Sequence, residues 1–213
     1  MGTLGSVKRP LSLVIGILLV GVVAYLVWEY RADFGMGGPG GASPGGAGSM
    51  AWQTVDRSAD GFKVQMPPAA VSETQIPAYS DHGVVEQVPM IEATVDDPNG
   101  GPGTTYAVAW ADGPPVEQAA GDDAEKTLDM ARDGALGRTE TSLVSESTHD
   151  RDGYRIRDFM ARNVAGGILD GRLILNGTHL YMLLATHPSL SARRDADVNR
   201  FYDSFTLTAA PQQ

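Results

Sequence analysis

An uninterrupted apolar run near the start of the chain, Leu11 to Trp28, constrains this sequence more than any other feature. It holds eighteen residues and no charged side chain. As a helix, rising about 1.5 Å per residue, it would be roughly 27 Å long, close to a hydrocarbon core of about 30 Å. A helix also satisfies its own backbone hydrogen bonds in lipid. We therefore predict a transmembrane anchor helix over residues 11–30 that contacts the lipid bilayer through residues 11–28.

The flanking charges predict the orientation of this anchor. Lys8 and Arg9 precede the run, and no surplus of positive charge follows it. The positive-inside rule places residues 1–10 in the cytoplasm and the rest of the chain outside. The alternative is a cleaved signal peptide, but its apolar region spans about 7–15 residues and ends in a small-residue cleavage site. The prediction is a single-pass signal anchor in the cell inner (cytoplasmic) membrane, with a periplasmic or otherwise extracytoplasmic domain.

Residues 31–50 are predicted to be a flexible linker. Eight of the fourteen residues from Gly35 to Gly48 are glycine. A coil of this length and composition has a root-mean-square span of about 20 Å. The residues that follow, 51–209, have the length of one domain.

Charge and cysteine content limit what this domain can bind. Residues 51–213 contain 13 Lys and Arg against 24 Asp and Glu, a formal charge of −11. A net negative domain is a poor binder of phosphate backbones, so we predict no nucleic-acid partner. The chain has no cysteine, which excludes disulfides, thiolate metal sites and a lipid-modified cysteine.

Hydrophobic patterning predicts strands in the first half of the domain. Residues 61–67 alternate apolar and polar, which indicates a half-buried strand. Residues 84–95 form a second candidate, in which Pro89 suggests an edge or a bulge. In residues 104–111 large apolar residues alternate with alanines, so we expect an interior strand whose alanine face is closely covered by a helix.

Helical and strand patterns alternate in the second half. Residues 122–136 carry an apolar stripe at helical spacing, and so does a final segment, 191–204, which precedes a short strand. Further strands are predicted over residues 139–148, 154–164, 168–175 and 178–186. The predicted fold class is α+β: a twisted antiparallel sheet with helices packed on it, preceded by one transmembrane helix and a Gly-rich linker.

The dipeptide Asn176-Gly177 is typical of a two-residue type I′ hairpin turn. This turn would place Leu173 opposite Leu180. The hairpin face that carries Leu173 would then belong to the core, together with Leu175, Leu180, Met182 and Leu184.

The second face of this hairpin is the candidate ligand or partner face. It presents Arg172, His179 and Tyr181, and the neighbouring strand adds Arg155 and Arg157. Guanidinium groups bind carboxylate or phosphate, and the tyrosine ring offers an apolar wall. Two structural alternatives stay open for these residues: a solvated face with cross-strand pairs, or a face covered by a helix.

Motifs for catalysis and for metal or cofactor binding are missing from the sequence. It has no G-x-S-x-G elbow, no H-E-x-x-H, no phosphate-binding loop and no C-x-x-C. We therefore predict no catalytic residue, no cofactor and no metal. A Ser-His-Asp triad assembled only in space is the alternative, because triads are recognised by geometry.

Two short signatures, Gly61-Phe62-x-Val64-x-Met66-Pro67 and Phe201-x-x-Ser204-Phe205-x-Leu207 after Tyr181, carry a family resemblance. They resemble PsbP-like domains, a group that includes the bacterial DcrB-like envelope lipoproteins. The chain departs from the DcrB-like pattern in having a membrane helix in place of a lipid-modified cysteine. The resemblance implies an antiparallel sheet with helices on it, in a non-catalytic binding or accessory module.

These observations together predict a membrane-anchored, extracytoplasmic, non-catalytic binding or accessory protein of the cell envelope, with an unknown ligand. A protein of the envelope or of a membrane complex is the expected partner. One alternative is a structural or accessory subunit of a larger membrane complex, held through its transmembrane helix. The other is a membrane-tethered hydrolase.

Overall fold

The computed structural model describes residues 17–18, 51–80, 85–98, 100–112, 122–137, 141–177 and 179–208. Of the apolar run it includes only β1 (Ile17–Leu18), which pairs with the end of β4. The predicted anchor helix otherwise lies outside the described residues, as does the linker of residues 31–50, and both stay predictions. No helix in the described part of the chain is long and apolar enough to cross a membrane.

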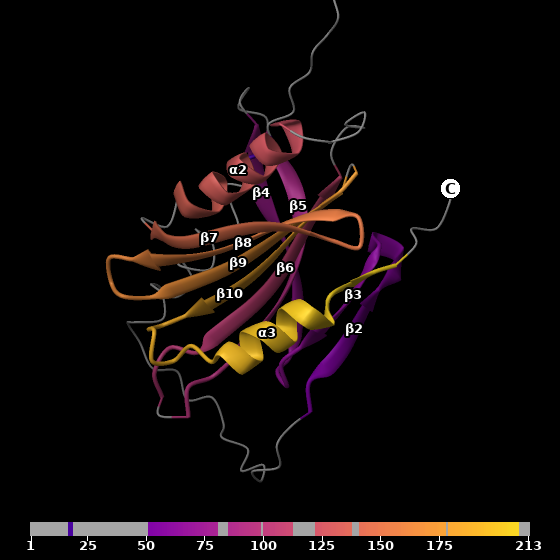
Figure 1. Ribbon diagram of the computed structural model, residues 1–213. Coiled ribbons are helices and arrows are strands. Elements are labelled where there is room, and N and C mark those ends of the chain that lie inside the picture. The colour runs from indigo at the N-terminus through magenta and orange to yellow at the C-terminus, as the bar shows by residue number, and fades with distance from the viewer. Residues whose placement is uncertain are drawn as a thin grey trace, which may run out of the picture.

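The described residues form two antiparallel sheets and two helices (Figure 1). The large sheet has the strand order β1-β4-β5-β6-β10-β9-β8-β7, and the small one the order β11-β3-β2. After β1, the elements are β2 (Gln53–Arg57), the 3-10 turn η1 (Ser58–Asp60), β3 (Phe62–Met66), β4 (Val71–Ser80), β5 (Val85–Val95), β6 (Thr104–Asp112), α2 (Asp122–Gly137), β7 (Thr141–Arg151), β8 (Tyr154–Asn163), β9 (Ile168–Asn176), β10 (His179–His187), α3 (Asp195–Ser204) and β11 (Thr206–Leu207).

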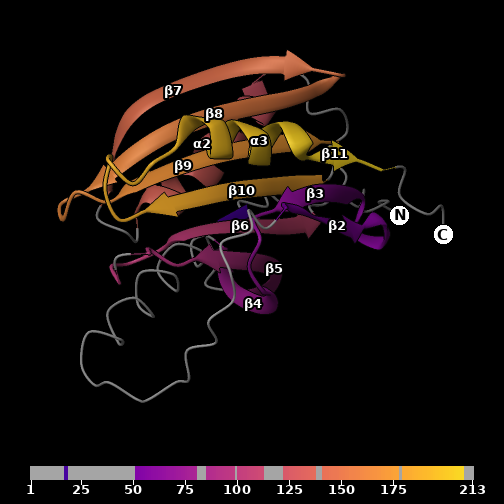
Figure 2. The ribbon, with the colours of Figure 1, turned by 90° about the horizontal axis from the view of Figure 1, so that it is seen from below.

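The two helices cover opposite faces of the large sheet. Figure 2 shows α3 and the small sheet in front of it and α2 behind. One core cluster lies between α2 and the sheet, and a second lies between the sheet and the layer formed by α3, β2, β3 and β11. The predicted α+β sheet with helices packed on it is confirmed for the described residues.

Strand β6 is the interior strand that its alanines predicted. Ala107 and Ala109 are buried in the cluster that includes α2, whereas Tyr106 and Val108 face the other cluster. Small side chains let the α2 stripe, which includes the fully buried Leu128, approach the sheet closely. Because both faces of β6 are covered, it separates the two halves of the core.

The β9–β10 hairpin turns one residue later than predicted. Asn176 pairs with His179, so β9 continues through Asn176, and Leu173 lies opposite Met182 instead of Leu180. The pairing is shifted by two residues, and because side chains alternate with a period of two, each residue keeps its predicted face. Leu173 is fully buried in the α2-side cluster, as predicted.

Strand β4 was not predicted, and Pro89 lies in a strand that is not at the edge. β4 pairs with β5 over residues 71–79, and β5 pairs with β6 from Met90 to Val95. Pro89 therefore lies one residue before the β5–β6 ladder begins, where β5 is paired on one side only. This position suits a residue without a backbone N–H.

Candidate functional site

The five predicted site residues do not share one face of the sheet. In the β8–β9 ladder Arg157 lies opposite Leu173, and Arg155 lies opposite Leu175, so both arginines are on the α2 side. Arg172 lies opposite Leu183, on the α3 side. The prediction of a single arginine-rich face is wrong because the register between β8 and β9 places the two sets on opposite surfaces.

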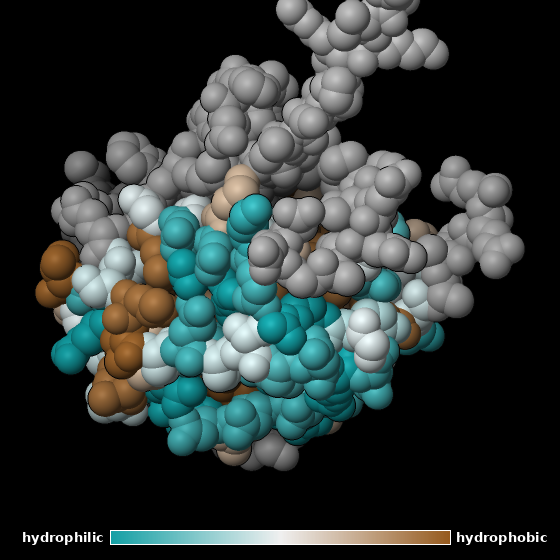
Figure 3. Space-filling model, turned by 45° about the horizontal axis from the view of Figure 1, so that its top comes forward, coloured by the Kyte–Doolittle hydropathy of each residue, from teal (hydrophilic) through white to brown (hydrophobic). Residues whose placement is uncertain are grey.

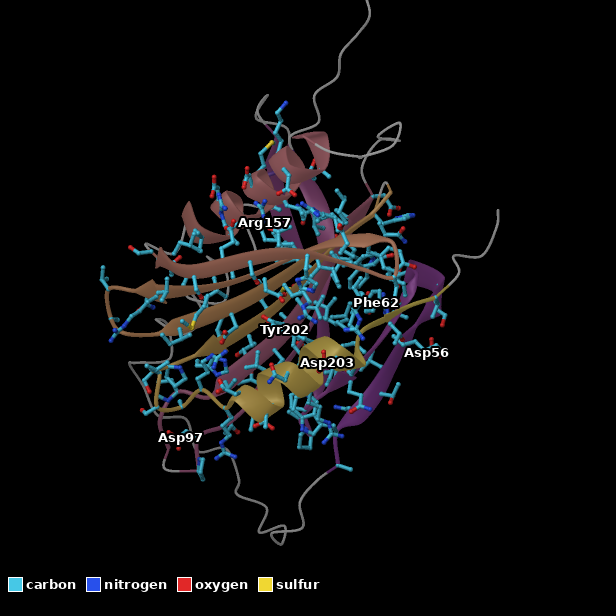
Figure 4. All side chains as sticks on the ribbon, in the orientation of Figure 1. Asp56, Phe62, Asp97, Arg157, Tyr202 and Asp203 are labelled. Atoms are coloured by element: carbon cyan, nitrogen blue, oxygen red, sulfur yellow. The ribbon has the colours of Figure 1, made fainter. Side chains whose placement is uncertain are left out.

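The two arginines on the α2 side are ion-paired to the helix. The Arg157 side chain is only 4% exposed, and its guanidinium donates to Glu125 and Asp129 of α2 and, over 3.2 Å, to Thr148 Oγ1. Arg155 pairs with Glu125 as well, and hydrogen bonds from Arg155 lower the pKa of that carboxyl. Figure 4 shows Arg157 at the side of α2. These arginines fasten α2 to the sheet, which is a structural role.

Tyr181 belongs to the core. Its ring centroid lies 5.7 Å from that of Phe62, and its hydroxyl donates to the Asp60 carbonyl over 3.2 Å. Burial raises the pKa of Tyr181 to about 12. His179 is exposed at the end of the hairpin, where its Nδ1 lies 2.5 Å from Asp112 Oδ1. Tyr181 is therefore not available as the wall of an open site.

Arg172 lines a groove between α3 and the strands β7 to β9. The groove has a volume of about 560 Å³, and a smaller cavity of about 270 Å³ lies between the tip of the β7–β8 hairpin and β11. Arg172 and Tyr202 line both, so the two hollows adjoin at these side chains. We call the two hollows together the α3 groove, and the polar and charged residues of the larger one are Ser145, Glu146, Ser147, Asp158, Asp170, Arg172, Arg193, Asp195, Asn199 and Tyr202.

The centre of the α3 groove is a rigid group of three side chains. Arg172 donates to Asp158 through two bonds, Nε–Oδ1 at 2.6 Å and Nη2–Oδ2 at 2.9 Å. Its guanidinium carbon also lies 4.6 Å from the centroid of the Tyr202 ring. Burial raises the pKa of Tyr202 well above its ordinary value, so this hydroxyl stays neutral. A bidentate pair stacked on a ring holds its geometry without a ligand.

A second ion pair closes one end of the groove, next to the start of α3 (Asp195–Ser204). Arg193 donates to both carboxylate oxygens of Asp170 at 2.8–3.0 Å. Nε2 of His187 lies 3.2 Å from Asp170 Oδ2, within ion-pair distance but outside hydrogen-bonding geometry. Burial would raise the pKa of Asp170, but His187 and Arg193 outweigh it and hold the pKa below its ordinary value.

The group formed by Asp170, His187 and Arg193 must also be considered as a possible hydrolase site. A hydrolase of this kind requires a histidine near a hydroxyl and a carboxylate. Nδ1 of His187 lies 3.4 Å from Thr104 Oγ1. His187 is 3% exposed, however, and it lines neither part of the α3 groove. A nucleophile and its base must both reach a bound substrate. The cluster therefore does not favour a hydrolase.

Sequence reasoning found one groove residue, Arg172, and missed the others. Tyr202 belongs to the apolar stripe predicted over residues 191–204 and is buried, but nothing in the spacing of that stripe indicated a cavity beside it. Arg193 and Asn199 carry no local signal either. In the described residues no group of three or more His, Asp or Glu side chains is arranged to hold a metal ion.

Comparison with known proteins gives a distant likeness of fold. No protein-family model matches the chain, and no curated protein matches its sequence. Among solved structures it is similar to the cyanobacterial PsbP protein (CyanoP) of Synechocystis sp. PCC 6803, with 15% identity and a TM-score of 0.48 over 78% of this chain and 98% of that chain. It is also similar to PA94, a protein of unknown function from Pseudomonas aeruginosa, with 7% identity and a TM-score of 0.35 over 66% of this chain and 85% of that chain. The PsbP-like and DcrB-like resemblance of the sequence stays a prediction.

Proposed function

We propose that this chain is a membrane-anchored, extracytoplasmic binding or accessory protein of the cell envelope, with no catalytic activity of its own. The α3 groove is the surface that binds its ligand or a segment of its partner. The observation that carries this proposal is the pairing of Arg172 with Asp158 and Tyr202 at the centre of an open groove. Such a preformed, mixed polar and apolar concavity is typical of a binding site.

The groups in the groove suit recognition better than bond-making. Its two arginines already have carboxylate partners, Asp158 for Arg172 and both Asp170 and Asp195 for Arg193, so the positions of both guanidinium groups are fixed. Ser147 and Asn199 add neutral donors and acceptors, and Met160 adds an apolar surface. A ligand with both polar and apolar parts fits this lining.

The membrane part of the proposal comes from the sequence. The apolar run of residues 11–28 has the length of a membrane span, and Lys8 and Arg9 precede it. The glycine-rich residues 31–50 then let the domain move while keeping it near the bilayer. The proposed location is the inner membrane, with the domain on the extracytoplasmic side.

A bulky side chain placed in the groove tests this function. Asn199 lines the groove, whereas Ala196, on the same helix, is exposed and does not. We expect molecules that co-purify with the full-length protein in mild detergent to be lost from Asn199→Trp and retained by the matched control Ala196→Trp, as measured by mass spectrometry. If both variants retain the same set, the groove is not the binding surface, and a subunit held through its anchor helix becomes the better account.

A further inference from the structure

One polar group that lines the α3 groove has no partner. Tyr202 is only 7% exposed, and its hydroxyl group is buried without a hydrogen-bond partner among the described residues. Figure 4 shows Tyr202 where α3 meets the large sheet. A buried hydroxyl without a partner destabilises a fold, so most buried polar groups are paired. A ligand bound in the groove would supply the missing hydrogen bond.

The hydroxyl of Tyr202 faces the larger hollow of the groove. The charged groups that act on its pKa are Asp170, Asp158, Arg172 and Arg193, and all four line this hollow. The two aspartates raise the pKa by more than the two arginines lower it. The hydroxyl therefore lies in a region of net negative potential, which favours a cation beside it. A neutral tyrosine hydroxyl can accept a hydrogen bond from such a group.

Acidic side chains outnumber basic ones in the larger hollow. It is lined by three aspartates, Asp158, Asp170 and Asp195, and by two arginines. Glu146 lines it as well, but its carboxylate pairs with Arg132 of α2. Residues 51–213 carry a formal charge of −11, and much of the surface shown in Figure 3 is hydrophilic. The groove is therefore better suited to a cation than to an anion.

Two exposed aspartates beside the groove can accept further hydrogen bonds. Asp195 is 77% exposed and pairs with Arg193. Asp203 is 67% exposed, and its Oδ1 lies 3.7 Å from Nη1 of Arg151 and 3.9 Å from Nη1 of Arg172, both beyond hydrogen-bonding distance. A carboxylate offers about four lone-pair sites. Each aspartate could therefore accept from an incoming cation without losing its present partner.

The smaller hollow adds an apolar surface next to these charges. Ile156, Ile174 and Phe205 line it, and all three belong to the core cluster on the α3 side. Arg172 and Tyr202 line both hollows, so an apolar group in the smaller one would lie next to a cationic group in the larger one. A ligand that fills both must carry the two kinds of group close together.

From these observations we infer that the α3 groove binds a peptide segment of a partner protein in which a lysine or an arginine is next to an apolar residue. The inference rests on the proposed function of the groove. The cationic side chain lies in the larger hollow, where it donates to the Tyr202 hydroxyl and its charge is balanced by the aspartates. The apolar side chain enters the smaller hollow. Neighbouring residues of a peptide supply both groups at this short spacing.

Short peptides test this inference on the full-length protein in phosphatidylcholine nanodiscs. The probe is N-acetyl-lysyl-leucinamide, and its matched controls have glutamine or glutamate in place of the lysine. Saturation-transfer NMR measures the binding of each peptide, with empty nanodiscs as the blank. We expect the lysyl peptide to bind at least about tenfold more tightly than either control, because a hydrogen bond from a charged group discriminates by about this much.

Two variants locate the bound cation. Tyr202→Phe removes the hydroxyl but keeps the ring that stacks on Arg172. It should bind the lysyl peptide about tenfold more weakly. Its thermal stability should not fall, because the hydroxyl has no partner in the free protein. Asp203→Asn should also weaken binding, whereas the matched control Asp133→Asn, an equally exposed aspartate on α2, should not.

The outcomes separate this inference from the proposed function. A glutamyl peptide that binds as tightly as the lysyl one, with both lost in Asn199→Trp, would overturn the cationic ligand and leave the groove as the binding surface. A lysyl peptide that binds equally to the wild type and to Asn199→Trp would overturn both. Binding that Tyr202→Phe leaves unchanged, or no binding of any peptide, would overturn the inference alone, since co-purification tests the groove separately.

Discussion

At the residue scale, Arg157 shows how burial and pairing decide what an arginine does. From the sequence it was a candidate for anion binding, because its strand was expected to lie beside the hairpin face that carries Arg172. In the structure its guanidinium is occupied by carboxylates that come from α2, 28 and 32 residues away in the chain. A guanidinium with such partners has no free edge for a ligand, and its removal leaves Glu125 and Asp129 with only their more exposed partners, Arg155 and Arg132.

Replacing Arg157 should therefore destabilise the domain. We expect Arg157→Ala to lower the free energy of unfolding by about 1–3 kcal/mol, because its buried hydrogen bonds are lost. Arg155→Ala, whose side chain is 37% exposed, is the control and should cost much less than Arg157→Ala, because solvent screens its ion pairs. Urea unfolding of residues 51–213 measures both. Equal, small effects would show that Arg157 does not hold α2 on the sheet.

Asp170 predicts a pH dependence of stability. Its pKa in the folded protein lies below the ordinary value of 3.8, because His187 and Arg193 outweigh the effect of burial. A carboxyl whose pKa is lower in the folded than in the unfolded protein stabilises the fold. This stabilisation is complete at a pH above the pKa of the unfolded state, and it is lost as the pH falls through the pKa of the folded state. Below about pH 4 we therefore expect Asp170→Asn to lose stability less steeply than the wild type in urea unfolding. Parallel pH profiles for the two proteins would contradict this.

At the element scale, the β9–β10 hairpin shows that a turn motif predicts the presence of a hairpin but not the pairing register of its strands. Asn176-Gly177 correctly indicated a hairpin, but Asn176 is still in the strand and Gly177 is the first loop residue. Gly177 has a φ of 57°, a conformation that glycine adopts more readily than asparagine. The resulting shift of two residues changes every cross-strand pair but no face.

Leu173 provides the test of that face. Leu173 is fully buried on the side of β9 that faces α2, so Leu173→Ala should lower the free energy of unfolding by about 2–5 kcal/mol. Val164→Ala, at a side chain that is 87% exposed, should change it by less than about 0.5 kcal/mol. Thermal and urea unfolding report both values. A cost for Leu173→Ala as small as that of the control would mean that the α2 side is not the core of this hairpin.

At the scale of the whole molecule, the two faces of the large sheet differ: ion pairs close the α2 side, whereas the α3 side carries the proposed binding groove. The α2 side is closed by ion pairs that fasten the helix to β8. On the α3 side the helix packs on the sheet but leaves a groove between itself and the strands β7, β8 and β9. The proposed binding surface therefore lies on the face whose helix leaves part of the sheet uncovered.

The topology of the chain in the membrane can be tested on cells. Protease added outside spheroplasts should cut within residues 34–50 and release the domain if the N-terminus is cytoplasmic, as the positive-inside rule predicts from Lys8 and Arg9. Immunoblotting of the released fragment, with opened cells as the control, measures this. Protection of the linker until cells are opened would mean the opposite orientation. A mature N-terminus beyond Trp28 would mean a cleaved signal peptide.

The sequence by itself determined most of the secondary structure and which faces are apolar. The alternation of residues 62–66, the alanines of β6 and the stripe of α2 are local patterns, and burial follows them. Strand β4 was not predicted because its alternation of apolar and polar residues is weak. Among its described side chains, only that of Ile76 is fully buried.

The tertiary structure alone decided which side chains meet. The register of β8 on β9 separated Arg157 from Arg172, and helix α2 supplied the partners of Arg157 from a distant part of the chain. The α3 groove is formed by β7, β8, β9 and α3 together. The physical reason is one of range: side-chain periodicity depends on neighbours in the chain, whereas ion pairs and cavities depend on packing between segments that no local pattern relates.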